Sequence, residues 1–155
     1  MDMNKKLTFL VIVTLIALAI LIGLLLFWNF YPYKTTTTAP QPYPIVYPEN
    51  KVVMQGNYIS YEFAYENFTS VLPKVERQFV DGIIFNAAGS HAPTLTEPGK
   101  GTARVQVKIP ETLPPGNYYI RVIVLHQMNP IRLIKSEYRT ENFEVIARDS
   151  ETASR

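Results

Sequence analysis

The sequence predicts an all-β domain, an antiparallel β-sandwich of about seven strands, preceded by one N-terminal transmembrane α-helix. Three observations support this prediction. The chain begins with an uncharged apolar run, continues with a Thr- and Pro-rich stretch, and then alternates apolar with polar side chains. Of its 155 residues about 120 follow the apolar run, enough for one domain with a hydrophobic core.

The composition excludes several classes of function. The chain has no Cys, so disulfides, zinc–thiolate sites, iron–sulfur clusters and thiol catalysis are all excluded. The formal net charge is +2 and the Lys and Arg residues form no long run, so we expect no nucleic-acid partner. The 10 Tyr and 8 Phe residues favour β-structure.

The apolar run extends from Leu7 to Phe27 and contains no charged residue and no Pro. A helix of this length spans about 31 Å, the thickness of the hydrocarbon core of a bilayer. A helix also satisfies its own backbone hydrogen bonds, as lipid requires. We therefore expect residues 1–6 to be a cytoplasmic tail and residues 7–30 to be a transmembrane helix whose partner is the lipid bilayer.

The residues that flank the helix predict its orientation and its outer boundary. Lys5 and Lys6 precede it and only Lys34 follows closely, which places the N-terminus in the cytoplasm and the remainder in the periplasm or outside the cell. The sequence thus predicts a single-pass protein of the cytoplasmic (inner) membrane. An aromatic belt is expected at the outer headgroups, formed by Trp28, Phe30, Tyr31 and Tyr33.

Two other interpretations of the apolar run remain open. A cleaved signal peptide normally has a shorter apolar core and small residues at its cleavage site, whereas Trp28 and its bulky neighbours follow this one. A pilin-like precursor normally has a small residue just before the apolar run, where this chain has Lys6. An uncleaved anchor is the interpretation we prefer.

Residues 31–44 are expected to form a linker. Thr35–Thr38 are followed by three prolines in five residues, a composition that favours an extended, semi-rigid path. A proline-rich ligand for an aromatic groove is the alternative.

The β-sandwich domain is expected to span residues 45–147. Period-two alternation is clear over Tyr58–Phe68, Ala103–Ile109 and Tyr118–Met128, and Asp81-Gly82 predicts a hairpin turn. Residues 148–155 are polar and are expected to be disordered.

A turn before the strand at Tyr118 carries a family resemblance. Leu113-x-Pro115-Gly116-x-Tyr118, followed by alternating apolar residues, resembles the start of the penultimate strand of immunoglobulin-like and fibronectin type III-like domains. The resemblance implies a Tyr hydroxyl that bonds back to the chain at this corner. The fibronectin spacing would select Tyr119, but the alternation favours Tyr118, because Tyr119 would direct Arg121 inward. The closing segment, residues 129–145, also resembles membrane-anchored phage proteins of unknown function.

His126 and Met128 are the residues that suggest a metal site. Imidazole and thioether together suit Cu(I), and this pair resembles the His-x-Met of extracytoplasmic copper chaperones, which implies His91 as a third ligand. The Met that such proteins carry upstream is absent here, so ordinary packing of His126 and Met128 is the interpretation we prefer. We therefore expect no metal and no cofactor.

No residues suggest catalysis. Ser90-His91 lies in the Gly- and Pro-rich loop Ala87–Gly101 without an orienting acid or a nucleophile elbow. We therefore expect a non-enzymatic protein-interaction or structural module, an accessory subunit of a membrane or envelope complex, cellular or phage-encoded. The alternatives are an extracytoplasmic copper-delivery protein and a small subunit of a respiratory membrane enzyme.

Apolar side chains on the second face of two strands point to a further partner. Ile123 and Leu125 lie opposite the predicted inner face of their strand, and Ile83–Phe85 has no clear alternation. Either the domain covers these side chains itself, or a protein partner or a second copy does. Internal burial is the interpretation we prefer.

Overall fold

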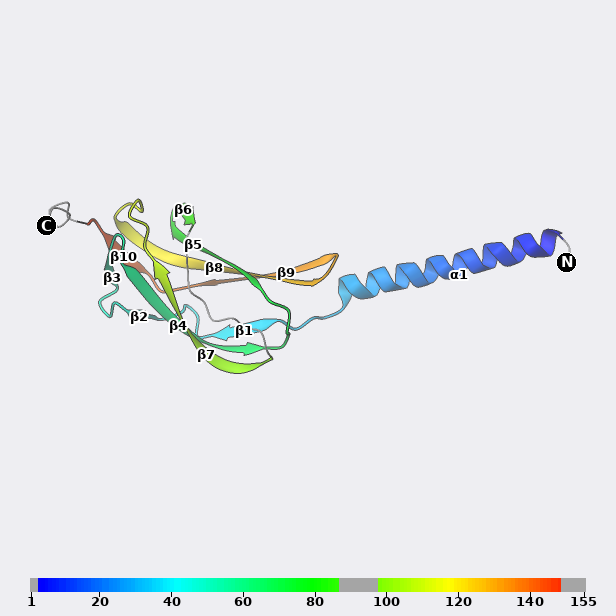
Figure 1. The fold of residues 1–155 in the computed structure, drawn as a ribbon, viewed down its shortest axis with the longest axis horizontal. Helices are drawn as coiled ribbons and strands as arrows, with labels where there is room; N and C mark the ends of the chain where they lie inside the picture. The colour runs from blue at the N-terminus through cyan, green and yellow to red at the C-terminus, as the bar shows by residue number, and fades with distance from the viewer. Residues whose placement is uncertain (1–2, 87–97, 149–155) are drawn as a thin grey trace. The chain divides into compact units, whose positions relative to one another are not determined.

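The computed structural model describes residues 3–86 and 98–148. The chain is mostly β-structure with one N-terminal apolar helix (Figure 1). It divides into two compact units, one made of Met1–Tyr33 with Met128–Leu133, the other of Lys34–Gln127 with Ile134–Arg155. The first contains the helix and the tip of a hairpin, and the second contains the β domain.

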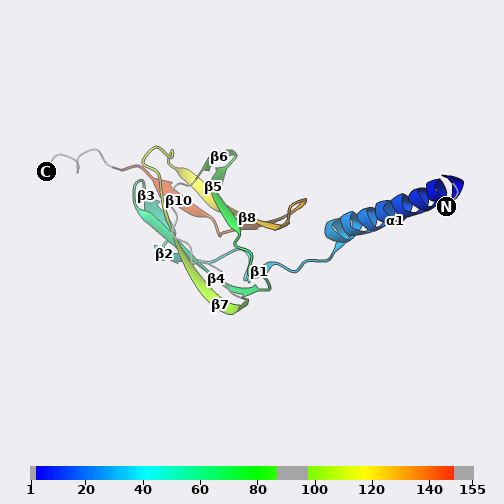
Figure 2. The same ribbon diagram turned by 45° about the vertical axis from the view of Figure 1, so that its right-hand side comes forward.

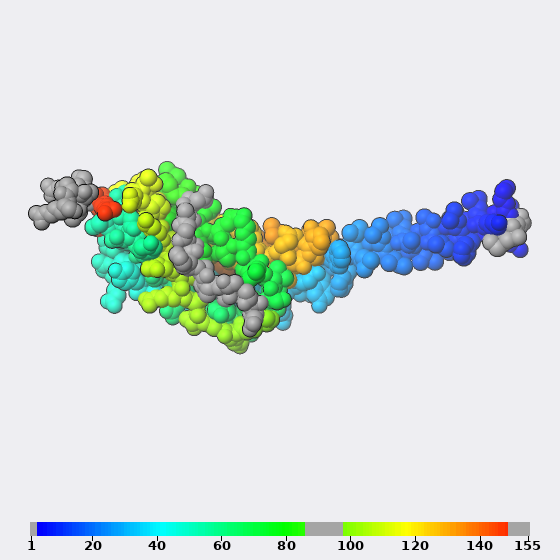
Figure 3. Space-filling view, in the orientation of Figure 1, coloured from blue at the N-terminus to red at the C-terminus, as the bar shows by residue number. Residues whose placement is uncertain are grey.

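Helix α1 spans Met3–Phe30, which is 28 residues, and none of its described side chains is buried. Figure 3 shows its side chains (blue) open to the surroundings along the visible face. The only hydroxyls in the apolar run, on Thr8 and Thr14, each donate to the carbonyl four residues earlier at 2.9 Å. The helix is therefore long and apolar enough to cross a membrane, and it satisfies its own polar groups.

The first sheet is organised around β4 (Tyr58–Asn67). Along one edge β4 pairs with β7 (Gly99–Lys108) over ten residues in antiparallel register. Its other edge pairs first with β1 (Thr36–Ala39) and then with β2 (Ile45–Tyr47), both antiparallel. Two consecutive short strands thus share one long partner.

The second sheet is organised around β8. Its strands are β3 (Val52–Met54), β5 (Lys74–Asp81), β6 (Ile83–Asn86), β8 (Gly116–Asn129), β9 (Arg132–Arg139) and β10 (Phe143–Ile146). Their order is β3-β10-β8-β5-β6, and β9 also pairs with β8. The β3–β10 pair is parallel, whereas the pairs β10–β8, β8–β5 and β5–β6 are antiparallel. Figure 2 shows β5, β8 and β10 on one side of the domain and β4 and β7 on the other.

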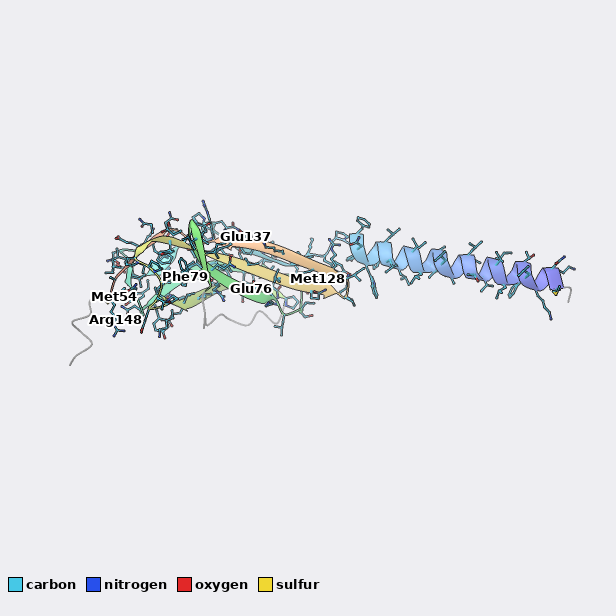
Figure 4. All side chains as sticks on the ribbon, turned by 90° about the horizontal axis from the view of Figure 1, so that it is seen from above. Met54, Glu76, Phe79, Met128, Glu137 and Arg148 are labelled. Atoms are coloured by element: carbon cyan, nitrogen blue, oxygen red, sulfur yellow. The ribbon has the colours of Figure 1, made fainter. Side chains whose placement is uncertain are left out.

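Side chains from both sheets form one hydrophobic core. Tyr118, Ile120 and Val122 project into it from β8, as the alternation of that strand predicts. Phe79 of β5 is fully buried and packs against Phe143 of β10, with ring centroids 6.3 Å apart (Figure 4). Ile59 and Tyr61 of β4 belong to the same cluster, so the core is continuous between the two sheets.

The structure differs from the expected linker over residues 31–44. Thr36–Ala39 form β1, and Tyr43 is 1% exposed, with its N–H donating to the Arg139 carbonyl at 2.9 Å. The folded unit therefore begins well before residue 45. A run of Thr among prolines has no apolar alternation, so its pairing with β4 leaves no trace in the sequence pattern.

The strand count also differs, since the described residues contain ten strands where about seven were expected. Part of the excess comes from β1 and β2, which have four and three residues. Alternation cannot be recognised in runs that short. The expected hairpin around Asp81-Gly82 is present, formed by β5 and β6.

The two apolar anomalies have different outcomes. Ile123 is 8% exposed and Leu125 is half-buried. Ile83 and Ile84 of β6 remain exposed, and β6 is the outermost of the described strands on its side of the sheet. Internal burial thus accounts for Ile123 and for Phe85, which packs against the core, and not for Ile83 and Ile84.

Candidate membrane-interface site

The C-terminal end of α1 is an aromatic cluster. The rings of Phe27 and Tyr31 lie 4.9 Å apart, and those of Tyr31 and Tyr33 also lie 4.9 Å apart. The Tyr31 N–H donates to the Phe27 carbonyl at 2.9 Å, so one more helical turn forms before Pro32 ends the helix. Trp28, Tyr31 and Phe30 are exposed. The expected interface residues therefore lie together at this end of the helix.

A helix end leaves carbonyl groups without partners inside the helix, and the last turn of α1 has no basic residue. The missing partners come from the tip of the β8–β9 hairpin, which we define as Met128–Leu133 (orange in Figure 3). The Asn129 side-chain amide donates to the Trp28 carbonyl at 2.9 Å and to the Tyr33 hydroxyl at 3.2 Å. A residue one hundred positions away thus caps the helix.

Arg132 makes the second connection between the hairpin tip and the helix end. Its guanidinium donates to the Tyr31 carbonyl and lies 5.5 Å from the centroid of the Tyr33 ring. A cation at the C-terminal end of a helix also interacts favourably with the helix dipole. Arg132 therefore supplies the positive charge that the helix lacks in its own last turn.

The turn of the hairpin tip is closed by its own side chains. The Asn129 side-chain oxygen accepts a hydrogen bond from the Ile131 N–H at 3.1 Å, and Pro130 has no N–H to satisfy. Ile131 and Leu133 are 52% and 54% exposed. Sequence reasoning did not assign these residues to the interface. The sequence signal that could have identified them is the Asn129-Pro130 turn, followed by Ile131 and Leu133 on either side of Arg132.

The turn before β8 contains the residues of the family resemblance. The Tyr118 hydroxyl donates to the Pro114 carbonyl at 2.9 Å, and burial raises the pKa of Tyr118, with the Asp81 carboxylate adding to the effect. Leu113 is 1% exposed, while Pro115 is exposed. A Cβ at Gly116 would lie 3.0 Å from a carboxylate oxygen of Asp81, so only glycine fits without displacement. These residues form a structural corner.

His126 lies in a small buried polar cluster with Thr36 and Asn67. The Thr36 hydroxyl donates to the Asn67 side-chain oxygen at 2.9 Å, and His126 Nε2 lies 3.4 Å from the same hydroxyl. His126 is 1% exposed, its Nδ1 has no hydrogen-bond partner, and burial lowers its pKa. The imidazole is therefore held neutral inside the domain.

Of the three residues of the copper alternative, His126 and Met128 lie two positions apart on β8, with the His126 side chain buried. His91 lies outside the described residues. Within residues 3–86 and 98–148, no group of three His, Asp or Glu side chains could hold a metal ion. A metal ion at this site would have to reach the His126 side chain, which solvent does not reach.

A second buried polar pair lies between the sheets. The Arg77 side chain of β5 donates from Nε to the Tyr61 hydroxyl at 2.8 Å, and burial raises the pKa of Tyr61. Tyr43 stacks parallel to Tyr61, with ring centroids 5.7 Å apart, and its hydroxyl lies 2.6 Å from that of Thr38. These tyrosines connect the Thr- and Pro-rich residues 31–44 to the core, so their role is structural.

The described surface of the domain has shallow clefts. The first, about 450 Å³, is lined by Tyr47, Met54 and Tyr58 among others, with no charged or His side chain. A second, about 230 Å³, contains Glu137, whose carboxylate is paired with Arg121 at 3.3 Å and with Lys135 at 3.4 Å.

Comparisons with known proteins give no family. No protein-family model matches the chain, and no curated protein matches it. The resemblance of the closing segment to phage proteins therefore has no support.

Solved structures with some likeness to the chain include an alkylpurine DNA glycosylase from Pseudomonas fluorescens, at 19% identity and a TM-score of 0.40. That match covers 74% of this chain and 32% of the glycosylase, so the chain spans about a third of that protein.

Two others are domains of similar size with immunoglobulin-like β-sandwich folds. A CARDB domain from Pyrococcus furiosus, in complex with di-metal ions, is 13% identical with a TM-score of 0.34, over 75% of this chain and 98% of the domain. A PapD-like domain of human CEP192 is 11% identical with a TM-score of 0.34, over 76% of this chain and 93% of the domain. With TM-scores of 0.40 or less, these likenesses carry no argument about function.

Proposed function

We propose that this chain is a single-pass membrane protein whose β domain serves as a non-enzymatic interaction or structural subunit of a membrane or envelope complex. The observation that carries the proposal is α1, 28 residues long, with none of its described side chains buried. In water such a surface would be strongly unfavourable, whereas in a bilayer it needs no cover. The aromatic cluster at its end supports the same assignment.

The proposed orientation has the N-terminus in the cytoplasm and the β domain in the periplasm or outside the cell. It is supported by Lys5 and Lys6 before the helix, against Lys34 after it. Because the chain has no Cys, single cysteines report the orientation directly. In intact cells a membrane-impermeant maleimide should label Glu144→Cys and not Asn4→Cys. The reverse pattern would overturn the orientation, and labelling of neither before lysis would overturn the spanning topology.

We further propose that the β domain is an immunoglobulin-like sandwich. The support is its own geometry, in which two largely antiparallel sheets share one core and a Tyr hydroxyl bonds back to the chain before a long central strand. Such a sandwich is suited to holding or bracing another protein.

The partner contact we propose is β6. Ile83 and Ile84 are exposed on the outermost described strand of this side of the sheet, the kind of edge to which another strand can add. The test is purification of the full chain from its membrane in mild detergent. A partner or a second copy should remain bound, and Ile83→Ser with Ile84→Ser should reduce its yield at least about tenfold.

Ile146→Ser is the matched control, since Ile146 is also an exposed apolar side chain near the end of a strand and should change nothing. Purification of the chain alone, as a monomer under every mild condition, would contradict an accessory role. Equal loss of the partner in the control and the β6 variant would leave the accessory role intact and move its contact away from β6.

A further inference from the structure

We infer that the hairpin tip, Met128–Leu133, is a second membrane contact whose Ile131 and Leu133 side chains enter the boundary between the headgroups and the acyl chains. The inference rests on the proposed function, because it requires α1 to span the bilayer. It adds an element of the β strands to a membrane contact that the sequence assigns to the helix alone. The partner is the lipid bilayer itself.

The first argument is the position of the hairpin tip beside the end of the helix. Asn129 is bonded to the Trp28 carbonyl and the Tyr33 hydroxyl, and Arg132 to the Tyr31 carbonyl. Residues that contact the last turn of a spanning helix share its depth in the membrane. The tip is therefore held at the level of the aromatic cluster, where Trp and Tyr rings meet the headgroups.

The second argument is the chemistry of the tip. Ile131 lies in the turn and Leu133 is the second residue of β9, and both are about half exposed. Arg132 lies between them in the sequence, with its guanidinium over the Tyr33 ring. Two exposed aliphatic side chains beside a cation are typical of elements that lie in a membrane interface.

The third argument is the backbone. A turn can enter a region of low water content only when its N–H groups have partners. At this turn Pro130 has no N–H, and the Ile131 N–H donates to the Asn129 side chain at 3.1 Å. The tip can therefore leave water without exposing an unsatisfied donor at its turn.

The experiment uses the full chain in vesicles of phosphatidylcholine and phosphatidylglycerol. Because the chain has no Cys, Ile131→Cys carries a single environment-sensitive fluorophore. Lipids with a nitroxide near the top of the acyl chain should quench this label about threefold or more. Ile84→Cys is the matched control, since Ile84 has the same side chain and is 51% exposed. Its label should be quenched little.

The single Trp of the chain, Trp28, separates the two levels of the proposal. Quenching of Trp28 and of position 131 supports the inference. Quenching of Trp28 with equal, weak quenching at positions 131 and 84 overturns the inference alone and leaves the anchor intact. This is also the result expected if a protein covers the tip instead of lipid. Absence of Trp28 quenching overturns the anchor itself.

A second variant guards against insertion driven by the fluorophore. The label is placed at Leu133→Cys, with residue 131 either Ile or Ser. If the native side chains hold the tip in the interface, Ile131→Ser should lower the quenching at position 133 about twofold or more. Identical quenching in the two proteins would contradict the inference.

Discussion

The guanidinium carbon of Arg132 lies 5.5 Å from the centroid of the Tyr33 ring, across one hundred residues of intervening chain. The same side chain donates to the carbonyl of Tyr31 at the end of α1. One residue of a β-hairpin thus stacks on an aromatic ring, caps a helix and supplies a positive charge to the negative end of its dipole.

Arg132→Ala should loosen the hairpin tip without unfolding the β domain. Loss of a charged hydrogen bond and a cation–π contact costs about 1–2 kcal/mol, so amide exchange over residues 128–133 should become roughly tenfold faster in detergent micelles. Hydrogen exchange measured by mass spectrometry checks this. Arg139→Ala, an exposed Arg at the other end of β9, is the control. Unchanged exchange in Arg132→Ala would mean that the contacts with the helix do not order the tip.

Tyr118→Phe should destabilise the β domain by about 1 kcal/mol, because it leaves the Pro114 carbonyl without the 2.9 Å hydrogen bond from the Tyr118 hydroxyl. Chemical denaturation of the full chain in detergent, followed by tyrosine fluorescence, measures the change. Tyr119→Phe is the matched control and should have an effect below about 0.5 kcal/mol. A larger effect at Tyr119 than at Tyr118 would assign the corner to the other tyrosine.

The stability of the β domain should fall between pH 7 and pH 5 because of His126. Burial lowers the pKa of this imidazole, so over this range the unfolded chain, with a pKa near 6.5, binds more protons than the folded one. Stability contributed by the neutral form is complete above the unfolded pKa and is lost as pH decreases toward the folded pKa.

Denaturation at several pH values tests this effect, with His91→Ala in every protein so that position 126 carries the sole imidazole. His126→Leu should flatten the pH dependence over this range. An equally steep dependence in His126→Leu would assign the effect to other groups.

Glu141→Gln should destabilise the domain near neutral pH by roughly 1 kcal/mol. The Glu141 carboxylate accepts from the Ile45 N–H at 3.1 Å and pairs with Lys51 at 3.0 Å, and these two contacts lower its pKa, the backbone hydrogen bond most. Because the folded pKa is the lower one, the stabilisation is present above the unfolded pKa and is lost as pH falls through the folded value.

The two proteins should therefore converge in stability at acidic pH, below the folded pKa of Glu141. Glu144→Gln is the control, since Glu144 is exposed on β10 in the same part of the chain. A difference between wild type and Glu141→Gln that persists at acidic pH would contradict this account of Glu141.

The sequence predicts those features whose cause is local. The helix follows from an apolar run of the right length, and β4, β7 and β8 follow from alternation over seven residues or more, although β7 begins at Gly99, inside the expected loop. Residues such as Thr36 and Tyr43 were placed in a linker because their partners lie on β4, in the Thr140 region and on β9. Pairing between distant segments leaves no periodic signal.

About half of the candidate site could be predicted from the sequence, for the same reason. Trp28, Phe30, Tyr31 and Tyr33 follow an apolar run and show their role by position. Asn129 and Arg132 reach the helix from about one hundred residues away, and nothing in their local sequence indicates where the helix ends. The buried positions of His126 and Arg77 are likewise set by tertiary structure, since polar residues on a strand are usually expected to face solvent.

The position of β10 also determines when the domain can fold. This strand comes last among the described strands, yet it lies between β3 and β8 and pairs with both. While the chain is being synthesised, β3 and β8 cannot be joined into one sheet until Phe143–Ile146 has been made. The domain cannot assemble in the order in which its strands emerge. Until β10 has been made, the edges of β3 and β8 with which it pairs are exposed on the nascent chain. A chaperone that binds unfolded chains would bind at these edges.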